Sequence, residues 1–236
     1  MGNFLIMNNV NSNTITGLLI QNLPPITKPR QRVNIEEIDG RDGDIITSLG
    51  YGSYDKEFQI GLSHNYDINE IIKFFDSEGT VTFSNEPDKY YNYKIIEQID
   101  YEKLIRFKTA NVKMHVQPFK YSINEEPIVA EFEEGDDLEV TVTNSGNIYS
   151  KPIITIQGSG DISVYLDNSQ VFEISLGNEE YIVIDVNLME AYKGNTLKNR
   201  LVTGNYDNFI LPSGNSTISF QGTVQAVEVR NYSRWI

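Results

Sequence analysis

Cysteine and histidine are the side chains with which a protein most readily does redox, metal or nucleophilic chemistry, and this 236-residue sequence has very few of them. It contains no cysteine and two histidines, His64 and His115. The lack of cysteine excludes disulfides, zinc–thiolate sites, iron–sulfur clusters and a thiol nucleophile. Two histidines separated along the chain do not form a histidine-rich metal site. The sequence therefore predicts no metal-ligating residues.

Three aspartates, Asp39, Asp42 and Asp44, lie within the segment Asp-Gly-Arg-Asp-Gly-Asp and could suggest a calcium loop. An EF-hand loop requires alternating ligands, then a glycine and a distant glutamate, and these aspartates lack that spacing. Asp-Gly pairs are typical of hairpin turns, because glycine accepts a positive φ without steric cost. We therefore predict a hairpin turn here.

Sequence motifs of the common enzyme classes are missing. There is no G-x-S-x-G elbow, no Walker loop and no H-E-x-x-H. Gly158-Ser159-Gly160 lacks the third glycine and the following helix of a dinucleotide site, so we predict a turn there. The 33 acidic residues could supply a carboxylate pair for glycoside hydrolysis, but the sequence cannot place one. We predict that the protein is not an enzyme and has no catalytic or cofactor-binding residues.

Two clusters could bind a partner. The basic residues Lys28, Arg30 and Arg32 follow a proline-rich stretch and could meet an acidic partner, although a solvated edge or linker is the simpler interpretation. A second cluster of aromatic side chains could stack on sugars or bases, although we favour cross-strand packing as the simpler explanation. This second cluster comprises Tyr90, Tyr91 and Tyr93.

The net charge limits the possible partners. The chain carries a formal charge of −14 and a sequence pI near 4.5, so it repels phosphate backbones and anionic membrane surfaces. We predict no nucleic-acid binding and no membrane insertion. The first residues have no basic region and too short an apolar run for a signal peptide, so we expect synthesis in a reducing cytoplasm.

The composition predicts a mainly β protein. Valine, isoleucine and threonine number 59, whereas alanine, leucine and methionine number 22. β-Branched residues favour strands, and the hydrophobic content of 39% is sufficient to build cores. The length suits two domains. We place an N-terminal β-rich, split-barrel-like domain at 1–130 and an antiparallel β-sandwich at 131–236.

The pattern along the first domain predicts an opening β-hairpin, in which apolar residues at 4–6 and at 15–20 flank a turn at NNVNSN, and one α-helix over 68–78. Asp67 is the expected N-cap, Glu70 lies three residues later and Gly79 lies near the expected C-cap. We expect strands over 89–101 and 104–121, after the helix.

The second domain shows short strands separated by Asn, Gly and Ser turns, which is typical of an antiparallel sandwich. We expect Val227, Val229 and Trp235 to form a last strand whose apolar side chains complete the sandwich.

Three segments together resemble the siphophage distal tail protein (Dit) family: IDGRDGDIITSLGYGSYDKEFQIGL, SKPIITIQGSGDISVYLDN and the ending GNYDNFILPSGNSTISFQGTVQAVEVRNYSRWI. In the ending, the turn at 211–215 and Trp235 occupy the places of the family's turn and final aromatic residue. The resemblance spans the chain. It implies a galectin-like fold for the C-terminal sandwich and a minimal form without an inserted arm or carbohydrate-binding module.

The resemblance also implies a function. Family members form a hexameric hub at the distal end of the tail, in one ring or in two rings back to back. The hub links the major tail tube protein to the tail-associated tip protein, and larger members also hold receptor-binding proteins. This chain would then be a baseplate component of the virion that needs no cofactor.

A lectin that recognises host cell-wall glycans is the alternative. Galectins bind sugar with a set of His, Arg, Asn, Glu and a stacking Trp. After residue 130 this sequence has no histidine, and its only tryptophan is Trp235, the penultimate residue. A shared fold alone does not carry function, so we favour the hub over the lectin, and both over a tail-tip hydrolase.

Overall fold

The computed structural model describes residues 2–236 and divides into two compact units. Unit 1 runs up to Ile123 and includes Ile236, and unit 2 is Asn124–Trp235. The fold is mainly β with curled antiparallel sheets, as the composition predicts. The division lies before the expected boundary at 130/131, because β10 (Ile128–Glu131) pairs with a strand of unit 2.

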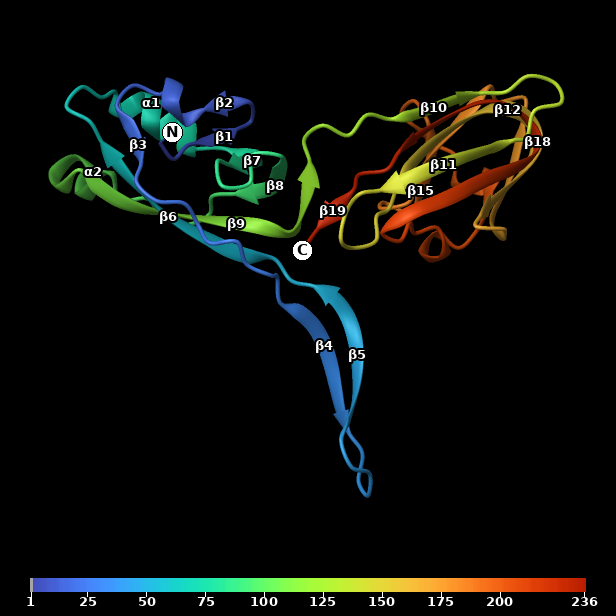
Figure 1. Ribbon diagram of the computed structural model, residues 1–236, viewed down its shortest axis with the longest axis horizontal. Coiled ribbons are helices and arrows are strands. Elements are labelled where there is room, and N and C mark those ends of the chain that lie inside the picture. The colour runs from blue at the N-terminus through green and yellow to red at the C-terminus, as the bar shows by residue number, and fades with distance from the viewer. Residues whose placement is uncertain (1) are drawn as a thin grey trace. The chain divides into compact units, whose positions relative to one another are not determined.

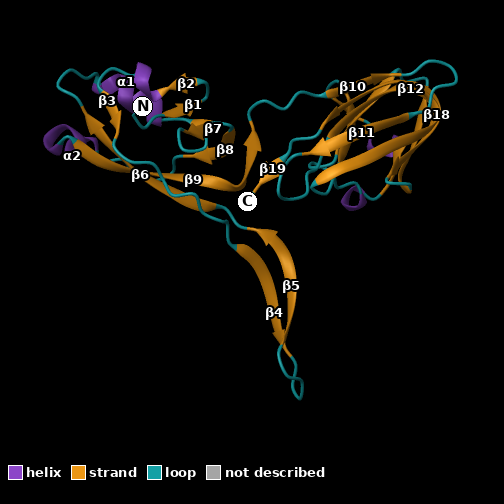
Figure 2. Ribbon diagram, in the orientation of Figure 1, coloured by secondary structure: helices purple, strands orange, loops and turns teal. Residues whose placement is uncertain are grey.

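Unit 1 is built on one antiparallel sheet with the strand order β2-β1-β7-β8-β9-β6-β3 (Figures 1 and 2). Side chains on β9 alternate between buried and partly or fully exposed, which is the period expected of a strand with one face in a core. The strands are β1 (Leu5–Met7), β2 (Val10–Asn11), β3 (Leu18–Ile20), β6 (Tyr54–Leu62), β7 (Glu78–Phe83), β8 (Lys89–Lys94) and β9 (Thr109–Ser122), and a 3₁₀ turn occupies Ser12–Thr14.

The opening hairpin differs in extent from the prediction. β1 pairs with the two-residue strand β2 across a tight turn at Asn8 and Asn9, both with positive φ. Asparagine tolerates that conformation, which suits a two-residue hairpin loop. β3, which we expected to follow directly in the hairpin, pairs with β6 instead.

The predicted helix is confirmed as α1 (Ile68–Phe75). The Asp67 side chain accepts hydrogen bonds from the backbone N–H groups of Asn69 and Glu70, as an N-cap does. Ile71, Phe74 and Phe75 are buried in the core of unit 1. The helix ends before 78, because the chain turns at Asp76 and enters β7. Gly79 is therefore a strand residue and not part of the helix cap.

A second helix, α2 (Tyr101–Phe107), corrects the prediction of strands over 89–101 and 104–121. Asp100 caps it by accepting a hydrogen bond from the Lys103 N–H at 2.8 Å. Leu104 is the one buried side chain of the helix. The wrong prediction arose because the β-rich segments on either side suggested continuous strand, whereas the helix signal is a single Asp cap.

β4 (Gln31–Glu37) and β5 (Asp44–Tyr51) form a separate two-stranded hairpin. Its turn contains Asp39 and Asp42, and Asp44 is the first residue of β5. Within residues 2–236 these strands pair only with each other. The hairpin turn predicted at Asp39–Asp44 is thus confirmed.

Unit 2 is an antiparallel sandwich whose sheet has the order β10-β18-β12-β14-β15-β16, with β11 also paired to β18 and β13 paired to β12 and β17. Its hydrophobic core is formed by buried aliphatic and aromatic side chains of these strands and of the loops between them. Besides β10, the strands of this sheet are β11 (Glu139–Asn144), β12 (Ile153–Leu166), β13 (Ser169–Gly177), β14 (Tyr181–Asp185), β15 (Glu190–Lys193), β16 (Thr196–Leu197), β17 (Val202–Gly204) and β18 (Gly214–Arg230), with 3₁₀ turns at Asn199–Leu201 and Tyr206–Asn208. The short strand β19 (Arg234–Trp235) follows β18 in the chain and is not part of this sheet.

Two long strands of unit 2 bend together, which corrects the prediction of a turn at Gly158–Gly160. This segment lies inside β12, where the pairing with β18 shifts register. A Cβ on Gly158 would lie 2.2 Å from the Thr223 carbonyl oxygen, and one on Gly222 would lie 2.3 Å from that of Asp161. The glycines therefore allow the two backbones to approach closely where the sheet folds over.

The last core strand is β18, which carries buried Val227 and Val229 as expected. Trp235 differs from the prediction. It lies beyond β18 in β19, is partly exposed and does not belong to the sandwich core.

Candidate interaction surfaces

The two histidines lie on different elements of unit 1. His64 is exposed in the loop between β6 and α1. His115, on β9, lies with Nδ1 2.8 Å from the Asp55 carboxylate, and Lys113 contacts the same carboxylate at 3.0 Å. Hydrogen bonds from His115 and Lys113 lower the pKa of Asp55. This is a surface ion-pair network, and no cluster of three potential metal ligands occurs in residues 2–236.

The three clustered tyrosines serve mainly in packing. Tyr91 and Tyr93 are buried in the core of unit 1, and Tyr90 stacks on Tyr121 of the neighbouring strand at 5.4 Å. The structure therefore favours cross-strand packing over a surface that stacks sugars. Lys28, Arg30 and Arg32 are exposed, at the end of the hairpin where β4 begins.

Unit 1 contains a buried group of charged side chains that the sequence analysis did not predict. The Lys120 ammonium lies 2.5 Å from the Glu86 carboxylate, which also accepts a hydrogen bond from Tyr91 at 2.6 Å. Lys56 is 2% exposed, donates to the Pro25 carbonyl at 3.0 Å and lies over the Tyr91 ring. Burial lowers the pKa of Lys56 to about 8.

The sequence does carry a signal for this cluster. Lys56 has the same strand parity as the buried residues Phe58 and Ile60, and Lys120 has the parity of Met114 and Val116. A lysine at an inward position of an alternating strand must find a buried partner.

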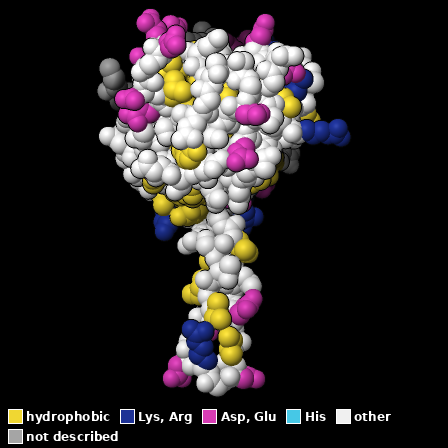
Figure 3. Space-filling model, turned by 90° about the vertical axis from the view of Figure 1, so that its right-hand side faces the viewer, with side chains coloured by type: hydrophobic (Ala, Val, Ile, Leu, Met, Phe, Trp, Pro, Cys, Tyr) yellow, Lys and Arg dark blue, Asp and Glu magenta, His cyan; other side chains and the backbone are white. Residues whose placement is uncertain are grey.

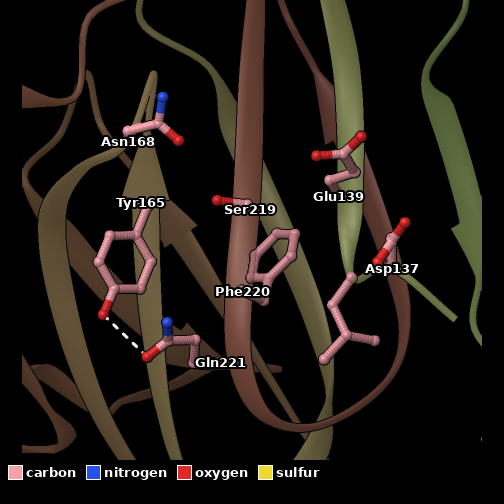
Figure 4. A pocket seen from close by; sticks show the side chains of 8 residues that line it. Asp137, Glu139, Tyr165, Asn168, Ser219, Phe220 and Gln221 are labelled. Carbon is pink, nitrogen blue, oxygen red and sulfur yellow. Dashed lines mark hydrogen bonds between the residues drawn. The ribbon is translucent and has the colours of Figure 1, made fainter. Parts of the chain in front are cut away.

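An open pocket of about 370 Å³ lies on unit 2 (Figure 4). Tyr165 and Gln221 stand on one side, joined by a hydrogen bond of 3.0 Å, and the carboxylates of Asp137 and Glu139 stand on the other. Phe220 forms part of the lining but is itself buried. One accessible aromatic ring beside amide and carboxylate groups is the kind of surface that a lectin would use.

We nevertheless expect no galactoside binding, because the pocket lining contains no His, Arg or Trp. Calorimetric titration with lactose at millimolar concentration should give no saturable heat. Saturable binding that Tyr165→Ala abolishes, and that Tyr181→Ala on β14 leaves intact, would instead support the lectin alternative.

The β4–β5 hairpin exposes aliphatic side chains along its length (Figure 3). Ile35 and Ile46 are directly opposite each other and are 54% and 65% exposed. Directly opposed residues lie on the same face of a two-stranded ribbon, so they form one continuous apolar surface. Soluble proteins seldom leave such surfaces without a function.

Comparison with solved structures shows which known fold this architecture has. The crystal structure of the Dit protein of phage SPP1, described as a paradigm of the hub adsorption apparatus of phages that infect Gram-positive bacteria, matches with a TM-score of 0.66. The sequences are 14% identical, and the match covers 98% of this chain and 100% of that one. This chain has the fold of the SPP1 Dit protein.

The Dit fold accounts for both units, because the match spans nearly the whole of each chain. The resemblance noted in the sequence is therefore confirmed at the level of the fold.

Other comparisons add less. Two structures of the phage P2 baseplate in its activated conformation, with calcium and with strontium, match at 12% identity with TM-scores of 0.49 and 0.43. They cover 98% and 97% of this chain, and the same shares of their own chains. No family model and no curated protein sequence matches. Neither helix in the described residues has the length and apolar character needed to cross a membrane.

Proposed function

We propose that this protein is a structural component of a phage tail, a hub that assembles into a hexameric ring at the distal end of the tail. The observation that carries this proposal is the match to the SPP1 Dit fold over the full length of both chains. In this role the ring joins the tail tube protein to the tail-associated tip protein and to the adsorption apparatus. Unit 1 forms the ring, and unit 2 faces outward.

The features of the molecule suit a structural role. The pocket on unit 2 is open and has a single accessible aromatic ring. By contrast, the hairpin offers an extended apolar surface that suits protein contacts.

The proposed hexameric ring has a definite molecular mass that can be measured. Six copies of 26.9 kDa give about 161 kDa, and cyclic symmetry makes every interface equivalent. Size exclusion coupled to light scattering should give this mass, and negative-stain images should show a ring with a central hole. A monomer at high protein concentration would contradict the proposal.

The same fractions should not bind double-stranded DNA at about 0.15 M salt, where charges are screened over about 8 Å. The chain carries a net charge of −14, and a channel wall that attracted phosphates would retain passing DNA. A gel-shift assay tests this. Tight DNA binding would contradict a role as a channel-forming hub.

A further inference from the structure

The β4–β5 hairpin is built as an element that needs a partner. A two-stranded ribbon by itself is marginally stable in water. This one pairs with no other strand in the described part of the chain, yet it exposes Val33, Ile35 and Ile46 on one face. A contact that covers this face would both bury the aliphatic side chains and hold the ribbon in place.

The outer end of the hairpin is strongly acidic. Between residues 36 and 44 it carries five carboxylates and one basic residue, Arg41. All of these side chains are exposed. A partner surface should therefore combine apolar contact area with positive charge. The acidic residues are Glu36, Glu37, Asp39, Asp42 and Asp44.

Such a surface exists on helix α2 of the same unit. Ile105 and Phe107 are 40% and 62% exposed, although both are large apolar side chains. The exposed basic residues Lys103, Arg106 and Lys108 lie among them, and the Arg106 guanidinium is 5.4 Å from the centre of the Phe107 ring. The acidic residue within the helix, Glu102, is confined to its first turn. We call Lys103–Lys108 the α2 patch.

We propose that the hairpin of one copy docks on the α2 patch of the next copy. The two surfaces match in character, because each exposes aliphatic or aromatic side chains and the charges beside them are opposite. The contact joins different elements of the two copies, so it is head-to-tail and can repeat around a closed ring. This inference rests on the proposed function, since it names the surfaces that would form the ring.

A mixing experiment tests the contact. The hairpin variant carries Ile35→Ser and Ile46→Ser, and the patch variant carries Arg106→Glu and Phe107→Ser. Each variant retains one intact surface. We expect each alone to be a monomer of 26.9 kDa by light scattering, and an equimolar mixture to form a dimer of about 54 kDa. The mixture cannot grow further, because each copy has used its one intact surface.

The control variant replaces two strongly exposed leucines of unit 2, Leu188→Ser and Leu197→Ser, and should keep the mass of the unaltered protein. Circular dichroism should show that all the variants retain their β structure. Raising the salt from about 0.05 to about 0.5 M should weaken the unaltered assembly, because opposite charges meet in the contact.

The outcomes separate this inference from the hub itself. A ring that persists in both variants would overturn the hairpin–patch contact and leave the hub role standing. A hairpin variant that dissociates while the patch variant stays assembled would show that the hairpin docks elsewhere, which also overturns the contact. A mixture that remains monomeric would overturn it as well. A monomeric unaltered protein would overturn both proposals.

Discussion

Replacing Phe172 by alanine is expected to lower the free energy of unfolding of unit 2 by about 3–5 kcal/mol, the usual cost of removing a large aromatic side chain from a core. Phe172 is 1% exposed. Its ring packs edge-on against Tyr206 at 5.0 Å and against Phe209 at 5.5 Å. The first partner lies in a 3₁₀ turn and the second directly after it, so the cavity would also loosen this segment.

Urea denaturation followed by circular dichroism measures this loss. Hydrogen exchange should localise it to residues 124–235, because each unit has its own hydrophobic core. The exposed Leu188 provides the control, since Leu188→Ala should change the free energy of unfolding by less than about 0.5 kcal/mol. Equal effects of the two substitutions would contradict the description of the core.

Replacing Lys56 by methionine is expected to stabilise the protein at pH 7. Burial is the main cause that lowers the pKa of Lys56 from 10.5 to about 8, and the charge of Lys120 adds to it, whereas Glu86 opposes it. At pH 7 the folded protein must hold this ammonium group charged in the core. The difference in the pKa of Lys56 between the unfolded chain and the folded protein corresponds to about 3 kcal/mol, at about 1.4 kcal/mol for each pKa unit.

The sign of the pH dependence follows from the same difference. Between about pH 8 and 10.5 the unfolded chain keeps the Lys56 proton and the folded protein loses it, so the free energy of unfolding rises with pH. Burial also raises the pKa of Tyr91, so above about pH 10 tyrosine ionisation in the unfolded chain opposes the rise. The window for the lysine is therefore about pH 8–10.

Urea titrations at pH 7, 8, 9 and 10 test both the stabilisation at pH 7 and the rise in stability with pH. Lys56→Met should raise the free energy of unfolding at pH 7 by about 2–3 kcal/mol, because water can reach the Pro25 carbonyl that Lys56 now satisfies. It should also remove the rise between pH 8 and 10. Lys73→Met, on the exposed side of α1, should do neither. A destabilised Lys56→Met variant would show that the buried ammonium contributes more through its contacts than its burial costs.

The sequence by itself determined the features that depend on local chemistry. An excess of β-branched residues required a strand-rich fold, because such side chains fit a pleated surface. Asp67 and the apolar spacing that follows were enough to predict α1, since an N-cap satisfies backbone donors within one turn. The Asp-Gly pairs at 39–44 predicted a hairpin turn for the same local reason.

The tertiary structure decided which of the strands with the same alternating pattern have a buried face. Val33 and Ile35 alternate along β4 as Phe58 and Ile60 do along β6, yet the first pair is in contact with solvent and the second is in a core. Alternation of apolar and polar residues indicates only that the two faces of a strand differ. A face becomes buried only when another layer of the structure covers it.

Gly158 is a second feature that the sequence alone does not determine. A glycine permits a turn, a bulge or a close strand crossing, and the sequence does not distinguish among these conformations. The position of the Thr223 backbone, which is distant in sequence, selects the bent strand. Lys56 is buried by residues distant in sequence, such as Tyr91 on β8, so its lowered pKa also appears only in the folded protein. Local signals specify elements, and the layers that cover those elements specify which side chains become a core and which become an interaction surface.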